Sequence, residues 1–193
     1  MRWPVFSIFA FLFLVLDDGL RTLWAIGYTS PCFLLILMVY VSLWTPPTTG
    51  GWAAIILGLL VDLQTPVYPV GQAVDVVLIG PTGIAYLIGA YVTVQLRGMV
   101  FRDSPLAVGV LVFLAGIFVH LVVVAILTVR GLPWPVAEPL PGWHAADQLV
   151  GCFFELLYTS LVAVPLAYVL TRLKWLWNFA PHGGAGFGHH HGR

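Results

Sequence analysis

The sequence predicts an all-α fold, a polytopic bundle of six transmembrane helices that forms one domain. Hydrophobic residues make up 60% of the 193 residues and charged residues only 8%, whereas a typical soluble domain has about 25% charged residues. Apolar runs recur from one end of the chain to the other, and 20 glycines and 14 prolines interrupt them. Six spans of about 20 residues would occupy roughly 120 positions, so we expect no separate soluble domain.

Three spans are expected in the first third of the chain, at residues 4–16, 31–44 and 51–62. The first is not followed by a small-x-small cleavage pattern, so we expect a retained span rather than a signal peptide. Ser30 and Pro31 suit the start of the second, since serine caps free amides and proline is tolerated in the first turn. The second and third are short for a bilayer of about 30 Å. They must therefore tilt little, extend at their ends or lie inside the bundle.

Three further spans are expected at residues 75–96, 106–129 and 148–171. A Pro-containing loop at 63–71 precedes the fourth span, which we expect to bend at residues 80–83, Gly-Pro-Thr-Gly. A Pro- and Trp-rich linker at 130–147 suits an extended interfacial loop. The sixth span contains Pro165, where we expect a kink.

The distribution of basic residues predicts both termini in the cytoplasm. With the amino terminus inside, six Lys and Arg residues fall on the cytoplasmic side and two, Arg21 and Arg130, on the other. All eight tryptophans lie at or beyond the ends of apolar runs, as expected at headgroup level. We expect the domain to cover residues 1–175, followed by a flexible Gly- and His-rich cytoplasmic tail at 176–193.

Four ionisable side chains lie in or at the edge of the predicted spans, and each follows a glycine by four residues: Asp62, Asp75, His120 and Glu155. Facing lipid would cost each a few kcal/mol, so we expect them to face the bundle, a partner or water. For Asp62 the alternatives are helix capping or interhelical bonding, and contact with a partner. We expect Glu155 to pair inside the bundle, with His120 as one candidate, and His120 to be a neutral core residue.

Searches for chemistry find little in this sequence. Zinc, nucleophile-elbow and Walker motifs are absent, and we expect no catalytic residue, metal or cofactor. The formal net charge is zero, so nucleic acid is not an expected partner. Cys32 and Cys152 lie in apolar runs and are expected to behave as small hydrophobes. A short His run in the tail is expected to be incidental.

The segment from Trp52 to Gly71, WAAIILGLLVDLQTPVYPVG, resembles the MreD family of bacterial rod-shape-determining inner-membrane proteins. Members carry a Gly-rich apolar helix ending in G-x-x-x-D and then a Pro/Gly loop. The matching positions here are Gly58, Asp62, Pro66 and Gly71. Pro31 and the apolar run after it are similar to the family's second span, and the length and the six predicted spans also agree.

This resemblance implies a non-enzymatic subunit of the cell-elongation machinery in the bacterial inner membrane. The implied partner is a single-span coiled-coil protein, MreC, and through it the actin-like MreB and peptidoglycan synthases. The second and third spans would form a groove for the partner's span, with a partner-binding set of Ala54, Gly58, Asp62 and Gly71.

Two alternatives to the adaptor stay open. The implied fold is similar to that of the substrate-binding subunits of energy-coupling-factor vitamin transporters, so a carrier with Asp62, His120 and Glu155 around a midplane cavity is the second hypothesis. Asp75 and Tyr86 would add to such a cavity. A membrane enzyme that uses His120 and Glu155 ranks last.

Overall fold

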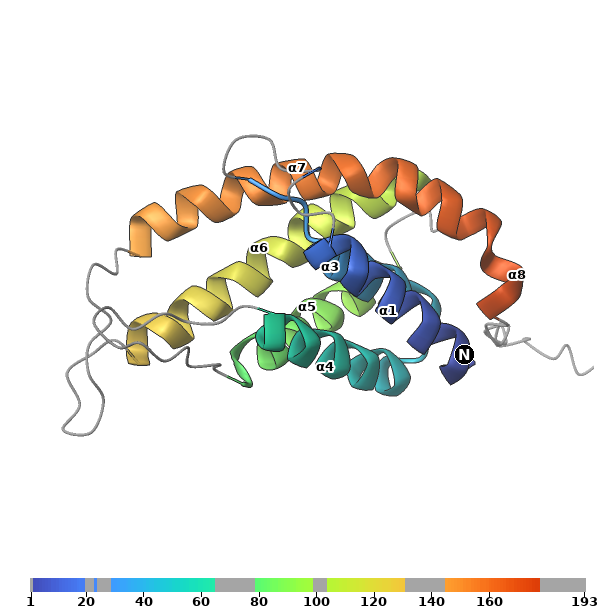
Figure 1. Ribbon diagram of the computed structural model, residues 1–193, viewed down its shortest axis with the longest axis horizontal. Helices are drawn as coiled ribbons and strands as arrows, with labels where there is room; N and C mark the ends of the chain where they lie inside the picture. The colour runs from blue at the N-terminus through green and yellow to red at the C-terminus, as the bar shows by residue number, and fades with distance from the viewer. Residues whose placement is uncertain are drawn as a thin grey trace, which may run out of the picture.

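The computed structural model describes residues 2–19, 23, 29–64, 79–98, 104–130 and 145–177. These residues are organised as helices, which confirms the all-α prediction for this part of the chain. The helices are α1 (Trp3–Gly19), α3 (Phe33–Trp44), α4 (Pro47–Gln64), α5 (Pro81–Leu96), α6 (Pro105–Arg130), α7 (Ala145–Arg172) and the short α8 (Lys174–Trp177). Figure 1 shows α6 and α7 as the two long elements, with the shorter helices gathered against one half of them.

Helix α3 lies at the centre of the bundle. Its sequence, FLLILMVYVSLW, has no polar face, and every residue from Phe33 to Leu43 is buried. A helix that is apolar all round is stable only when other elements enclose it, and α1, α4, α5, α6 and α7 all contact it. This is one of the three solutions expected for a short span, a position inside the bundle.

Helices α6 and α7 are long and apolar enough to cross a membrane, over residues Pro105–Val129 and Gln148–Arg172. They run in opposite directions (Figure 1), and Ser160 Oγ on α7 donates a hydrogen bond of 3.1 Å to the Gly109 carbonyl on α6. Many outward-facing side chains on both helices are apolar, and Leu161, for example, is 70% exposed. Helix α7 continues through Pro165 and curves along its length.

The end of α7 turns back towards the start of α1. In α8, Trp177 is fully buried, with its ring centroid 4.8 Å from that of Phe9 and 6.1 Å from that of Tyr40. The backbone N–H of Arg2 donates to the Trp177 carbonyl at 3.4 Å. The folded part therefore continues two residues past the predicted boundary at 175, because Trp177 belongs to the core.

The starts of α3, α4 and α5 differ from the predicted ones. Helix α3 begins at Phe33, not at Pro31, and Ser30 does not occupy its cap position, which belongs to Cys32. Helix α4 begins four residues earlier than predicted, at Pro47, and ends at Gln64, so this short span extends at both ends. Helix α5 begins at Pro81, inside the stretch where a bend was predicted, and residues 75–78 of the predicted span lie outside the described part of the chain.

Gly80 and Pro81 explain why α5 starts where it does. Gly80 has a φ of +124°, a conformation that favours glycine and lies outside the helical region, so the helix starts after it. Proline is tolerated in the first turn because its missing N–H has no partner there in any helix. The sequence pattern suggested an interrupted helix, whereas these two residues form a helix start.

Candidate functional site

The predicted partner-binding residues of α4 lie on one buried face. Ala54, Gly58 and Asp62 are four residues apart and so share a side of the helix. All three are buried, and Asp62 is only 3% exposed although it carries a carboxylate. Gly71 and Asp75, the other predicted residues of this region, lie outside the described part of the chain.

Asp62 caps the amino terminus of α5. Its Oδ2 accepts a hydrogen bond of 2.7 Å from the backbone N–H of Gly80, and its Oδ1 accepts one of 3.1 Å from Thr82. The first turn of a helix has N–H groups without intrahelical partners, and its dipole favours a negative charge. Of the two alternatives for Asp62, bonding within the bundle is the one that the structure shows.

Gly58 allows α4 and α5 to approach each other closely. A Cβ atom at this position would lie 2.6 Å from both the Gly83 Cα and the Thr82 carbonyl oxygen. Backbone atoms cannot yield as a flexible side chain can, so any larger residue must push the two helices apart. The G-x-x-x-D spacing thus places two contacts on one face of α4. Gly58 lets α5 cross closely, and Asp62 caps the start of α5.

This geometry changes the expectation for a partner. The Ala54/Gly58/Asp62 face is occupied by α5 of the same chain, and α3, the other wall of the expected groove, is enclosed. A foreign helix would reach Gly58 only if α5 moved away. The partner contact at these residues stays a prediction that this arrangement does not favour.

The other polar residues of the predicted spans lie on the two long helices. His120 lies on α6 and Glu155 on α7, and both are half-buried. The pairing of Glu155 with His120 stays a prediction, as does an enzyme that uses these two groups.

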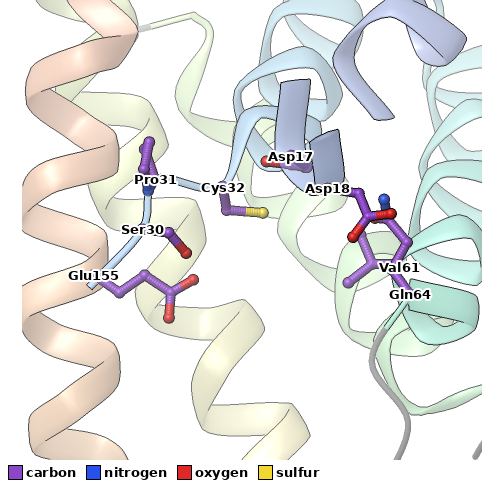
Figure 2. Close-up of a pocket in the computed structure, with 8 residues that line it drawn as sticks. All are labelled: Asp17, Asp18, Ser30, Pro31, Cys32, Val61, Gln64 and Glu155. Carbon is purple, nitrogen blue, oxygen red and sulfur yellow. The ribbon is translucent and has the colours of Figure 1, made fainter. Parts of the chain in front are cut away.

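Glu155 lines a small pocket with a volume of about 90 Å³. Its walls come from the ends of α1 and α4, from the segment before α3 and from α7, and consist of Asp17, Asp18, Ser30, Pro31, Cys32, Val61, Gln64 and Glu155. Figure 2 shows Glu155 on one side and Asp17 and Asp18 on the other, with the Cys32 sulfur pointing into the space between them.

Asp17 organises one wall of this pocket by capping α3. Its two carboxylate oxygens accept hydrogen bonds from the N–H groups of Phe33 (2.7 Å) and Leu34 (3.0 Å). Sequence reasoning missed this role and assigned the cap to Ser30. The signal was present, because an acidic pair closes the first apolar run and an aspartate can cap a helix from elsewhere in the chain.

Cys32 joins the pocket to the core. Its backbone N–H donates to Thr159 Oγ1 at 3.1 Å, and its sulfur lies 3.3 Å from the hydroxyl oxygen of the buried Tyr86. The pocket floor therefore connects α3, α5 and α7. Cys32 is a packed, hydrogen-bonded group rather than only a small hydrophobe.

The pocket wall is acidic. Three of its residues are carboxylic acids, and none of the lining residues is a lysine, arginine or histidine. Such a wall favours hydrogen-bond donors and cationic groups. Among the described residues, no group of three or more His, Cys, Asp or Glu side chains has the arrangement of a metal site.

Comparisons with family models, with curated proteins and with solved structures found no match.

Proposed function

We propose that this chain is a non-enzymatic, six-span subunit of the bacterial cell-elongation machinery, an inner-membrane adaptor of the MreD type. Its partner would be a single-span coiled-coil protein of the MreC type, and it would contribute to cell shape through MreB and peptidoglycan synthases. One observation carries the proposal. The G-x-x-x-D residues that resemble MreD, Gly58 and Asp62, lock α4 and α5 into one unit whose outer side is apolar.

Membrane placement is supported by where the apolar side chains lie. Helices α6 and α7 are long enough to span a bilayer. Helices α1, α4 and α5 pack in the same bundle and expose large apolar side chains such as Phe11, Trp52 and Tyr91. In water such a surface would be a liability, whereas acyl chains cover it at no cost. The five helices α1, α4, α5, α6 and α7 around the enclosed α3 support a bundle of six spans.

The orientation is supported by the chain ends. An even number of spans returns the chain to the side where it started, and the Arg2–Trp177 backbone bond places the start of α1 beside the end of α8. Arg2, Arg97 and Arg172 belong to this end of the bundle, which the positive-inside rule assigns to the cytoplasm. The acidic pocket then faces the outer side.

The partner's span is proposed to contact the outer face of α4 rather than its glycine face. Trp52 is 64% and Leu63 58% exposed on this face, and Ile56 lies between them. The Asp62 cap and the Gly58 crossing hold the opposite face rigid against α5, so the outer face is preorganised. Docking of another helix on this face then costs less conformational entropy.

Photo-crosslinking in cells tests this proposal. A photoreactive amino acid at Trp52 or Leu63 is expected to give an adduct with a single-span coiled-coil protein, identified by mass spectrometry. The same amino acid at Leu161, which is equally exposed but lies on α7, is the matched control and is expected to give none. Adducts of α4 with lipid alone, or equal adducts from Leu161, would count against the adaptor.

The carrier alternative is less well supported. Pockets for small-molecule ligands usually measure about 300–1,000 Å³, whereas the small pocket here has about 90 Å³. Asp62 faces α5, and His120 does not line this pocket. A vitamin-sized ligand retained by the purified protein in native mass spectrometry would reverse the order of the two hypotheses.

A further inference from the structure

Two arginines and two tryptophans are exposed at the end of the bundle where the two chain ends meet. Arg2 precedes α1 and Trp3 begins it, whereas Arg172 ends α7 and Trp175 belongs to α8. Trp3 is 44% and Trp175 75% exposed, and both arginines are exposed. We call these four residues the Arg/Trp edge, which lies at the end marked N and α8 in Figure 1.

The core fixes the outward position of Trp175. Residues two apart point to nearly opposite sides of a helix, and Trp177 is buried against Phe9 and Tyr40. Trp175 must then point away from the bundle. The Arg2–Trp177 backbone bond also holds the start of α1 beside α8, so the exposed tryptophans come from two elements that the fold joins.

Arg172 is held in place and still exposed. Its Nη2 donates a hydrogen bond of 2.9 Å to the Tyr168 hydroxyl, and its guanidinium carbon lies 5.2 Å from the centre of the Tyr168 ring. That contact uses one of the five N–H donors of the guanidinium. A preorganised guanidinium with further donors suits the oxygens of a phosphate group.

The described carboxylates lie elsewhere. Asp17 and Asp18 are at the opposite end of α1, Asp62 is near the opposite end of α4, and Glu155 is about five turns before Arg172 on α7. In the described ranges, the ends of α1, α7 and α8 that form the edge carry no acid. The edge is therefore cationic. Trp3 follows Arg2 directly in the chain, and Trp175 lies three residues after Arg172.

We infer that the Arg/Trp edge binds the headgroups of anionic phospholipids, with the arginines on the phosphates and the tryptophan rings at the level of the glycerol. Tryptophan prefers this interfacial layer, and basic residues at the surface favour anionic over zwitterionic lipids. This inference rests on the membrane placement proposed above but not on the adaptor role.

Native mass spectrometry of the detergent-purified full chain, titrated with dioleoyl phosphatidylglycerol or phosphatidylcholine, tests the inference. The wild type is expected to bind phosphatidylglycerol more tightly. The variant Arg2→Gln/Arg172→Gln is expected to lose about 10- to 30-fold in that affinity, with phosphatidylcholine binding unchanged. The matched control Arg2→Lys/Arg172→Lys keeps both charges and is expected to keep most of the preference.

Equal affinity for the two lipids, or a Gln double variant that binds phosphatidylglycerol like the wild type, would overturn the inference. Competition by inorganic phosphate at equal concentration would also overturn it, because the edge would then be a phosphate site rather than a lipid site. A protein that inserts in the membrane and lacks the lipid preference refutes this inference alone. A protein that does not insert refutes the proposed function as well.

Discussion

Asp17 and Asp62 do the same work at two helix starts. Each lies near the end of one helix, and each carboxylate accepts hydrogen bonds from two backbone N–H groups at the start of another. Inside an apolar bundle such N–H groups have no water to bond, and an unsatisfied one is costly. Two acids in a chain of very low charge are thus explained by the helix ends that they satisfy.

Removal of the Asp62 cap is expected to destabilise the fold. Asp62→Ala leaves the Gly80 and Thr82 N–H groups without their acceptors, which should lower the free energy of unfolding by about 1–2 kcal/mol. Asp62→Asn keeps one acceptor oxygen and should lose less. Unfolding in mixed detergent micelles measures both. The control is Asp18→Asn at an exposed neighbour of the other cap, and an equal effect there would contradict the capping role.

The close crossing of α4 and α5 at Gly58 is expected to be sensitive to any added side-chain atom. Gly58→Ala is expected to lower the free energy of unfolding by about 1–3 kcal/mol, because its Cβ meets the α5 backbone. Gly151→Ala on α7 is the matched control. Its Cβ would meet nothing within 4 Å, and the higher helix propensity of alanine should stabilise that helix by up to about 1 kcal/mol. The same micelle titration compares them, and a neutral Gly58→Ala would show that α4 and α5 are not in close contact.

At the residue scale, sequence reasoning could find polar groups but not their partners. It found Asp62 because a charge in an apolar run is costly, and interhelical bonding was one of its two alternatives. It could not assign the α5 cap, since Gly80 is 18 residues away along the chain. It could name His120 only as one candidate partner for Glu155, because rotation about two helix axes decides which side chains meet, and one sequence does not reveal that rotation.

At the element scale, the composition predicted the helices correctly for the described residues, but it did not predict where several of them start. Uniformly apolar α3 had to tilt little, extend at its ends or lie inside the bundle, and it lies inside. The starts of α3 and α4 were misplaced because Ser30 and the glycines at 50 and 51 suggested boundaries that tertiary contacts override. Remote caps such as Asp17 leave no local signal at the helix that they start.

The two tryptophans of α8 are expected to differ in how much they stabilise the fold. Trp177→Ala removes a fully buried ring and should lower the free energy of unfolding by about 3–5 kcal/mol. Trp175→Ala changes the same residue type two positions earlier, where the ring is exposed, and should cost well under 1 kcal/mol. Thermal unfolding of the purified protein, followed by tryptophan fluorescence, compares the two. Equal losses of stability from the two substitutions would mean that both rings are equally buried, which would contradict the described position of α8.

At the scale of the whole molecule, the fold class follows from a shortage of charge. A chain with 8% charged residues cannot cover its surface with polar groups, and the described helices expose large apolar side chains on α1, α4, α5, α6 and α7. Two of these helices are long enough to span a bilayer by themselves. The proposed six-span topology counts the four shorter helices α1, α3, α4 and α5 as spans in addition to α6 and α7.

Cysteine labelling in spheroplasts tests that topology most directly. In a background of Cys32→Ser and Cys152→Ser, single cysteines replace Asp18 and Ala146 at the proposed outer side and Gly98 at the proposed cytoplasmic side, all exposed positions. A membrane-impermeant maleimide is expected to label 18 and 146 in intact spheroplasts, and 98 only after lysis. Labelling of all three before lysis, or recovery of the chain in the soluble fraction, would contradict the account.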